Sequence, residues 1–592
     1  MNALTAAITP APTQPVPRLT ETLDRAVHAN MAQLTGGMSP AALGVAYIDW
    51  AAHLAMSPGK TAELAINAWT GAFKLANFAG ACFWVGGDPK ACLEPAEHDA
   101  RFRDKAWERW PYSFMAQSFL MVEDWWRQAA YGVRGVSVEH SRLIDFTNRQ
   151  VLDMTAPSNF VFTNPQVLDR TWAEGGSNLY RGWKNVIDDL ERQSKGRPPA
   201  GAEAFQVGRD LALTPGHVVF RNDLMELIQY SPTTETVHPE PILIVPAWIM
   251  KYYILDLTPK NSMIQYLVGQ GHTVFVVSWK NPDGDDRNIG FDDYRRLGVM
   301  AALDAIGEII PDTDVHGVGY CLGGTLLGVA AGAMAGRDDD RFKTLTLLAA
   351  QWDFTEAGEI RLFVNDASVS FLEDMMWSQG YLQAEQMSGA FHILRSKELI
   401  WSRIVREYLL GERLPMMDLM AWNADSTRMP YRMHTEYLRN FFLNNDLADG
   451  RHKVDGKTVA LTDIRAPIFA VGTEKDHVAP WRSVYKVRQL TDTDVTFVLT
   501  SGGHNAGIVS EPGHPRRRYR MATTAADDLA EDAEVWFAAH TPQEGSWWPA
   551  WQAWLADHSS APTAPPPEPR WLGDPEATLI PAPGRYVFDA DQ

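Results

Sequence analysis

Short apolar runs alternate with helical stretches beyond about residue 206, and this alternation limits the possible folds most strongly. The runs are rich in β-branched residues and bounded by turn residues, which is typical of buried strands. They lie at 241–246, 272–279, 315–320, 344–350, 467–472 and 495–500. Helices are predicted at 292–309 and 322–335, between successive strands. Strands that alternate with helices are joined by right-handed crossovers, so we predict an α/β fold with a mainly parallel sheet covered on both faces.

The segment before this sheet is predicted to be a mainly helical domain, over residues 20–205. Apolar residues recur there at three- and four-residue spacing. The spacing is clearest in 41–56, 61–83 and 112–130. The sequence GRPPAG at 196–201 is typical of a linker. Residues 1–19 are rich in Pro, Ala and Thr, and we expect them to form a disordered tail.

Two segments of the α/β domain predicted over 206–592 depart from the strand–helix rhythm. Residues 352–463 are mainly helical and loop-forming, and an insertion of that length between strands is typical of a lid over the sheet. Residues 541–592 are rich in Trp and Pro, and we expect an arm lying on the surface. The 22 tryptophans of the chain are typical of packing, or of contact with an apolar partner such as a lipid or polymer.

Composition excludes several classes of function. The formal net charge of −20 argues against a general nucleic-acid binder, which needs a basic face. Three cysteines, at 82, 92 and 321, are too few for a disulfide framework, so a reducing, cytoplasmic setting is expected. We find no secretory leader and no long apolar run in the sequence. Motifs for a metal site or a phosphate-binding loop are also missing, so no metal and no cofactor are expected.

The sequence Gly319-Tyr-Cys-Leu-Gly323 has the G-x-C-x-G spacing of a nucleophile elbow between a predicted strand and a predicted helix. Glycines leave room for the sharp turn, and the helix N-terminus favours a Cys321 thiolate. The Leu322 N–H would be one oxyanion donor. A second is expected from the loop after strand 241–246, from about Ala247 through Trp248 to Ile249. The alternative is a glycine-rich turn with a buried, inert cysteine.

Two further residues follow in the order that a triad on this fold requires. Asp476 comes directly after strand 467–472 and would be the acid, and His504 follows strand 495–500 in a glycine-rich loop and would be the base. His477 is a rival base, but a supporting role is favoured because adjacency to Asp476 points its side chain away. A thiolate attacks thioesters readily and can pass an acyl group onward, which favours acyl transfer over simple ester hydrolysis.

Other polar residues remain open to two interpretations. Asp256 could support the site or cap the helix predicted near Pro259. Arg395, with three more basic residues of the lid, could contact substrate phosphates, although a solvated helix face is favoured. The three are Lys397, Arg403 and Arg406.

Longer stretches around the elbow resemble the polyhydroxyalkanoate synthases. The elbow alone is less specific, because G-Y-C-L-G-G also occurs in dienelactone hydrolases. The resembling stretches are 158–165, 246–257, 271–282, 422–428, 501–507, 545–551 and 581–586. The resemblance therefore extends over nearly the whole chain.

This resemblance implies an α/β-hydrolase catalytic domain that polymerises (R)-3-hydroxyacyl-CoA, with release of coenzyme A, into an intracellular polyester. Cys321 would carry the acyl group and the growing chain, and His504 would deprotonate it. Asp476 would orient His504 or help to activate the hydroxyl of the incoming unit. The motifs resemble the class I form, which implies short acyl chains such as 3-hydroxybutyryl, a homodimer, association with granules and phasin partners.

The sequence departs from the family at Asn505, where members often have an aliphatic residue after the histidine, and in the basic stretch 512–519. Both departures bear on substrate preference. Two rival functions remain: a thioesterase or esterase of the dienelactone hydrolase kind, and a non-catalytic protein that coats granules. The large helical domain argues against the first, because small hydrolases need no such domain.

Overall fold

The computed structural model describes residues 19–82, 91–96, 99–573 and 578–589, and the chain divides into two compact units. The first unit comprises residues 1–33, 201–387 and 416–592, and the second comprises 34–200 together with 388–415. The tail expected at 1–19 lies outside the described residues except for Leu19. None of the described helices is both long and apolar enough to span a bilayer.

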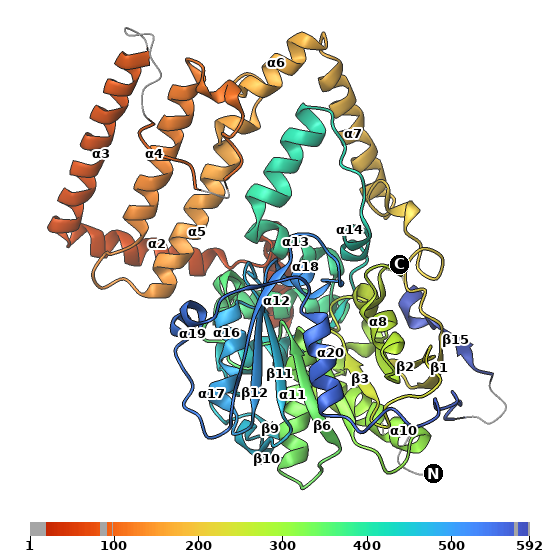
Figure 1. Cartoon of the computed structure of the whole chain (residues 1–592). Helices are drawn as coiled ribbons and strands as arrows, with labels where there is room; N and C mark the ends of the chain where they lie inside the picture. Colours follow the sequence, from red (N-terminus) through yellow and green to blue (C-terminus); the bar gives the residue numbers. More distant parts are fainter. Residues whose placement is uncertain (1–18, 83–90, 97–98, 574–577, 590–592) are drawn as a thin grey trace. The chain divides into compact units, whose positions relative to one another are not determined.

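An eleven-stranded sheet forms the centre of the first unit (Figure 1), in the order β14-β13-β12-β11-β6-β5-β3-β4-β2-β1-β15. The strands are β1 Gly216–Arg221, β2 Met225–Tyr230, β3 Ile242–Val245, β4 Val274–Trp279, β5 Val315–Tyr320, β6 Phe342–Leu348, β11 Ile468–Thr473, β12 Val495–Thr500, β13 Arg518–Thr524, β14 Gln543–Glu544 and β15 Ile580–Pro581. The run from β4 to β12 is parallel, and the outer strands are antiparallel.

The predicted strands are confirmed as β3, β4, β5, β6, β11 and β12, because buried apolar runs in a parallel sheet carry a strong sequence signal. Strands β1, β2 and β13 were not predicted. In β2, the polar residues Glu226 and Gln229 are fully buried and interrupt the apolar run. The helix predicted at 322–335 is confirmed as α11, Leu322–Ala335. The stretch predicted as one helix at 292–309 is helical but contains a π-helical segment, η7, at Tyr294–Met300.

Helices and short helical turns of the first unit connect and cover the strands. They are α1 Leu19–Thr35, η4 Ala202–Ala204, η5 Tyr252–Asp256, α8 Met263–Gly269, η6 Gly284–Asn288, α9 Phe291–Asp293, α10 Ala301–Ile309, α16 Trp481–Tyr485, α17 Val487–Leu490, α18 His504–Ile508, α19 Ala533–Ala539, α20 Trp548–Asp557 and η13 Tyr586–Phe588. The strands β3, β4 and β5 are buried along their whole length, so the core lies on both faces of the central sheet.

The insertion at 352–463 is helical with short strands. Its elements are η8 Glu359–Phe363, α12 Asp366–Gln379, β7 Tyr381–Leu382, α13 Ala384–Leu394, η9 Lys397–Trp401, η10 Ile404–Leu409, α14 Asp418–Asn423, β8 Met429–Pro430, α15 Tyr431–Tyr437, η11 Leu438–Leu443, β9 Lys453–Val454, β10 Lys457–Thr458 and η12 Leu461–Asp463. Its central part, 388–415, is grouped with the second unit.

The second unit is built on helices, of which α3, α4 and α5 run side by side (Figure 1). The elements of residues 34–200 are α2 Pro40–Ala55, α3 Pro58–Gly80, η2 Lys105–Glu108, α4 Tyr112–Ala130, α5 Val138–Thr155, η3 Pro157–Asn159, α6 Pro165–Ala173 and α7 Ser177–Ser194. Segment 388–415 packs closely on α7, since a Cβ on Gly182 would lie 1.7 Å from the Tyr408 carbonyl oxygen. Asn178 Nδ2 also donates to the Leu409 carbonyl at 2.8 Å.

The expectation of a surface arm after residue 541 is wrong for α20. The side chains of Trp547, Trp548 and Trp551 are fully buried. Their indole N–H groups donate to the carbonyls of Gly507 and Ile508 and to the Thr346 hydroxyl, at 2.9–3.0 Å. Buried indoles that are hydrogen-bonded in this way attach the end of the chain to the sheet.

Candidate active site

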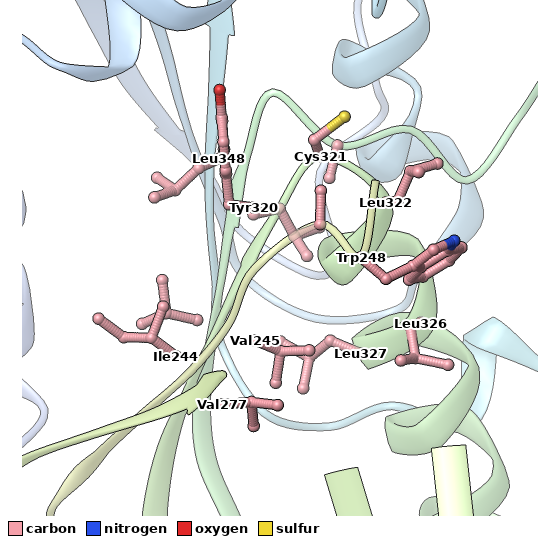
Figure 2. Packing of buried hydrophobic residues seen from close by; sticks show 14 of the residues in the cluster. Ile244, Val245, Trp248, Val277, Tyr320, Cys321, Leu322, Leu326, Leu327 and Leu348 are labelled. Carbon is pink, nitrogen blue, oxygen red and sulfur yellow. The ribbon is translucent and has the colours of Figure 1, made fainter. Parts of the chain in front are cut away.

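Cys321 lies between β5 and α11 in a strained backbone conformation, with φ 53° and ψ −121°. Positive φ is rare for residues other than glycine and is typical of a nucleophile held on a sharp turn. The Cys321 N–H donates to the Leu348 carbonyl at 2.8 Å, which fixes the turn to β6. Figure 2 shows the sulfur pointing away from the apolar side chains of β3 and α11. The thiol therefore lies at the carboxyl edge of the sheet.

Two glycines allow this turn to form. A Cβ on Gly323 would lie 2.0 Å from the Val245 carbonyl oxygen, and a Cβ on Gly319 would lie 2.3 Å from Gly324 Cα. Real Cβ atoms cannot approach a backbone so closely. A larger residue at 323 would force the elbow away from β3, and one at 319 would force the end of β5 away from the first turn of α11. The G-x-C-x-G spacing is thus required by direct backbone contact.

Asp476 and His504 are joined by a hydrogen bond of 2.7 Å between Asp476 Oδ2 and His504 Nδ1. Both follow the carboxyl ends of their strands, β11 and β12. The Asp476 carboxylate also accepts the Thr473 hydroxyl at 3.1 Å and the N–H groups of Val478 and Ala479 at 2.8 and 2.9 Å. The ring of Tyr320, directly before Cys321, stacks on the His504 ring with centroids 5.8 Å apart, so the elbow lies beside the base. The structure therefore brings the three residues predicted as a triad together.

Charges near His504 favour its imidazolium form. Burial opposes the charge on His504, but the negative charge of Asp476, with a further contribution from Cys321, outweighs it, so the pKa of His504 is raised well above its ordinary value. Burial likewise opposes the charge on Asp476, but His504 and the two backbone N–H donors hold the pKa of that carboxyl below its ordinary value. An imidazole in this position can take the proton of a cysteine thiol, and the thiolate is the reactive form of that nucleophile.

The residues expected to provide oxyanion donors lie beside the elbow. Leu322 is the first residue of α11, where a backbone N–H has no acceptor within the helix. Ala247 and Trp248 follow β3, the strand that contacts Gly323, and both are buried. The Thr427 hydroxyl donates to the Trp248 carbonyl at 2.7 Å, which holds this loop in place. The arrangement resembles the usual pair of N–H donors on this fold.

A second attachment of the oxyanion loop passes through a buried lysine. Lys251 Nζ lies 2.8 Å from Asp425 Oδ1 and donates to the Val587 carbonyl at 2.7 Å. The Tyr253 hydroxyl donates to the other oxygen of Asp425 at 2.8 Å. Two of the stretches noted in the sequence, 246–257 and 422–428, therefore bind each other directly.

Aromatic side chains surround the elbow on the side of the insertion. Trp248 packs edge-on against Tyr437, with ring centroids 6.0 Å apart, and Tyr437 packs against Phe441 at 5.5 Å. Phe354 contacts both of the latter residues. Burial, with a smaller contribution from the negative charge at Cys321, raises the pKa of Tyr437 well above its ordinary value. Cys321 and these aromatic residues belong to the same buried apolar core.

Asp256, whose role the sequence left open, has partners apart from the triad. Its carboxylate accepts the hydroxyls of Thr214 and Ser262, both at 2.6 Å, and Ser262 is the N-cap of α8. Burial raises the pKa of Asp256 despite these hydrogen bonds. Asp256 therefore connects the first helix after the oxyanion loop to the segment before β1.

His477 is half-buried next to Asp476, and the hydrogen bond to the acid is made by His504 instead. Arg395 belongs to the second unit and pairs with Glu398 at 3.3 Å. The other basic residues of this segment are also paired with carboxylates: Lys397 with Asp99, Arg403 with Asp189 and Arg406 with Glu412.

Sequence reasoning missed three residues of the site: Thr473, Tyr320 and Tyr437. Thr473 and Tyr320 end the strands that carry the acid and the nucleophile, so their positions were an available signal. Tyr437 comes from the insertion, and no sequence pattern connects it with Cys321. Among the described residues, no group of three or more His, Cys, Asp or Glu is arranged to hold a metal ion.

Comparison with known proteins identifies the family. Residues 98–267 match the family model described as the N-terminus of poly-beta-hydroxybutyrate polymerase, and residues 18–60 match a second model of the N-terminal part of that enzyme. Residues 240–511 match the alpha/beta hydrolase fold. A poly(3-hydroxyalkanoate) polymerase of Methylorubrum extorquens is 42% identical over 510 residues, which are 85% of this chain and 82% of the relative. The chain belongs to the poly(3-hydroxyalkanoate) polymerase family.

Other relatives in this family agree over the same span. Poly(3-hydroxyalkanoate) polymerase subunits of Rhizobium etli and Rhizobium meliloti are 39% and 38% identical, each over 85% of this chain and over 78% and 82% of their own lengths. The resemblance inferred from the motifs is thereby confirmed. So are the α/β-hydrolase fold and the assignment of the chain as an acyltransferase.

Proposed function

We propose that this polymerase builds its polyester on Cys321 from short (R)-3-hydroxyacyl-CoA units such as 3-hydroxybutyryl-CoA. The Cys321 thiolate attacks the thioester carbonyl and forms a tetrahedral oxyanion facing the Leu322 N–H and the loop at 247–249. The carbon–sulfur bond to coenzyme A breaks, and the His504 imidazolium gives its proton to the leaving thiolate. An acyl thioester on Cys321 and free coenzyme A are the products.

Chain growth uses the same residues, but His504 now accepts a proton from the substrate instead of giving one. The 3-hydroxyl of a second hydroxyacyl-CoA loses its proton to neutral His504 and attacks the acyl-Cys321 thioester. A new ester forms, the Cys321–carbonyl bond breaks, and a thiolate is regenerated beside imidazolium. The elongated CoA thioester then acylates Cys321 again and releases coenzyme A. Asp476 keeps the imidazole oriented through both steps, because its carboxylate is itself held by Thr473 and two N–H donors.

The observation that carries this proposal is a hydrogen-bonded Asp476–His504 pair beside the strained, positive-φ Cys321. The aromatic side chains near the thiol support polymerisation over hydrolysis, since an acyl-enzyme kept away from water survives until the next hydroxyl arrives. Thiol–thioester exchange needs no metal and no redox group, so the reaction requires no cofactor beyond the coenzyme A of the substrate.

The cellular setting is part of the same proposal. A polyester that remains attached to Cys321 becomes insoluble as it grows, so the enzyme would be found in the cytoplasm on polyester granules, with phasins as partners there. A homodimer and a preference for short acyl chains are proposed from the class I resemblance.

The test is incubation of the purified chain with 3-hydroxybutyryl-CoA. Coenzyme A release is followed with a thiol reagent, the insoluble product is analysed as polyester, and quenched enzyme is examined by intact mass. We expect coenzyme A release, polyester, and an acyl adduct on a peptide that contains Cys321. The Cys321→Ala variant should give none of the three.

Other outcomes would favour the rivals. Free 3-hydroxybutyrate without polyester would indicate a thioesterase, and an absence of coenzyme A release from the wild type would indicate a non-catalytic granule protein. Hydroxyacyl-CoA substrates of increasing length, assayed in parallel, test the proposed chain-length preference. Sedimentation of the enzyme with and without substrate tests the homodimer.

A further inference from the structure

A partly buried hydrogen bond connects the strand of the nucleophile with the helix of the base. The Tyr320 hydroxyl donates to Asn505 Oδ1 at 2.5 Å. Tyr320 is the last residue of β5, directly before Cys321, and Asn505 directly follows His504 on α18. Tyr320 is 3% exposed, so its hydroxyl depends on this partner instead of solvent. Asn505 is also the position at which the sequence departs from the aliphatic residue expected.

The ring held by this bond lies against the catalytic imidazole. The rings of Tyr320 and His504 are stacked, with centroids 5.8 Å apart and an interplanar angle of 27°. The hydrogen bond that Nδ1–H donates to the Asp476 carboxylate fixes one edge of the imidazole but leaves rotation about that contact possible. A ring packed against the face of the imidazole restricts that rotation. The stacked ring is itself fixed at both ends, by the β5 backbone and by Asn505.

We infer that Asn505 and Tyr320 form a positioning pair that keeps His504 aimed at Cys321. This inference deepens the proposed function, because the aligned imidazole is what forms the ion pair with the thiol. Neither residue is placed in contact with the acyl group. Their contribution to the rate passes through the orientation of His504, and small misplacements of a catalytic group cost large factors in rate.

The amide is suited to this position because it is uncharged. Burial, together with the negative charges of Cys321 and Asp476, raises the pKa of Tyr320, so the phenol remains a neutral donor. A carboxylate in place of Asn505 would add another negative charge next to this group. An aliphatic side chain would leave the Tyr320 hydroxyl buried without its acceptor, and the ring would shift toward solvent to recover a hydrogen bond.

The test is a double-mutant cycle with Asn505→Leu, Tyr320→Phe and the double variant. The readout is the rate of Cys321 alkylation by iodoacetamide as a function of pH, which reports the thiolate–imidazolium pair and needs no acyl-CoA. The rates of coenzyme A release, as kcat and KM, are measured in parallel. Asn30→Leu, in an exposed part of α1, makes the same chemical change away from the site and is the matched control.

We expect Asn505→Leu to slow alkylation near neutral pH by about tenfold and to change its pH profile, with a similar loss in kcat and little change in KM. Tyr320→Phe removes the hydroxyl that needs an acceptor and keeps the ring, so its loss should be smaller, about threefold. In the Tyr320→Phe background, Asn505→Leu should cost little more. Circular dichroism and thermal melts check that all variants are folded.

An equal loss from Asn505→Leu in both backgrounds would overturn the inference, because it would mean that the two side chains act separately. An unchanged pH profile of alkylation in Asn505→Leu would also overturn it. The proposed function can fail independently: a wild type that forms no polyester would leave the alkylation results and their interpretation intact.

Discussion

The carbonyl oxygen of Val245 lies where a Cβ on Gly323 would be, with a separation of only 2.0 Å between them. The end of β3 therefore packs directly on the first turn of α11. Because the oxyanion loop begins at the end of β3, this contact sets the distance between the loop and the thiol of Cys321.

Gly323→Ala is expected to separate the elbow from β3. Backbone cannot yield as a flexible side chain does, so we expect a loss of about 3 kcal/mol in the free energy of unfolding. Activity should fall by about 100-fold or more because the oxyanion donors move away from the thiol. Denaturant titration and coenzyme A release measure the two effects.

Gly307→Ala, on α10, is the control. Apart from the residue's own helix, no atom lies within 4 Å of the added Cβ, so this change should stabilise the protein by about 0.5–1 kcal/mol. Near-normal activity in Gly323→Ala would show that the contact with Val245 does not set the distance between the oxyanion loop and the thiol.

Asp476→Asn should reduce turnover by roughly 10³-fold, because an amide neither holds the imidazole in the same tautomer nor stabilises its positive charge. The variant should also change how stability depends on pH. Because the pKa of Asp476 is lowered, its contribution to the free energy of unfolding is complete above pH 3.8, its ordinary pKa. That contribution is lost as the pH falls through the pKa of the folded state. Because the pKa of His504 is raised, its contribution to the free energy of unfolding is complete below pH 6.5. That contribution is lost as the pH rises through the pKa of the folded state.

The difference in unfolding free energy between wild type and Asp476→Asn should therefore be largest between about pH 4 and 6.5, and should decrease at alkaline pH. Urea titrations across this range measure it. A difference that is independent of pH would show that the variant loses packing instead of the ion pair.

His272→Phe should make the protein more resistant to acid. The His272 ring is fully buried and stacked on His238 at 4.7 Å, and neither of its nitrogens has a hydrogen-bond partner among the described residues. Burial, with smaller contributions from His238 and His316, lowers its pKa to about 3. Below pH 6.5 the unfolded chain takes up a proton that the folded chain does not. The free energy of unfolding therefore decreases as the pH is lowered from 6.5 to about 3.

At pH 4.5 this single residue should cost roughly 2–3 kcal/mol of the free energy of unfolding, and a phenyl ring would remove that cost. Thermal melts of wild type and His272→Phe at pH 8 and pH 4.5 measure the difference. If both proteins lose the same stability between pH 8 and pH 4.5, other titrating groups cause the sensitivity to acid.

Arg101→Met should destabilise the helical unit strongly. The guanidinium is 6% exposed and lies 2.6 Å from Asp99, 2.8 Å from Glu123 and 3.1 Å from Asp153. Removal of the central cation leaves three carboxylates with only Lys397, at 3.6–4.0 Å, as a neighbouring cation, and breaking such a buried group typically costs about 3–5 kcal/mol. The control is Arg109→Met, whose pair with Asp169 is half exposed and should be worth less than about 1 kcal/mol. Hydrogen exchange in α4 and α5 measures the effect, and equal protection in both variants would contradict it.

The sequence alone was sufficient for much of the catalytic unit. The six central strands were predicted because a parallel strand, buried on both faces, appears as an apolar run. The positions of Cys321, Asp476 and His504 followed from their places after such strands, since the carboxyl ends of parallel strands meet at one edge of the sheet. These signals are local, so one sequence is enough to read them.

Only the tertiary structure could decide which distant segments bind each other. The composition of the Trp-rich segment around Trp551 predicts a surface arm. The segment is buried instead, because the Thr346 hydroxyl and two backbone carbonyls accept hydrogen bonds from its indoles. The part of the insertion at 388–415 packs on α7 through Gly182, and Asn505 meets Tyr320 across 185 residues. Such pairings depend on complementary shape and hydrogen bonding in three dimensions, and they leave no periodic pattern in the chain.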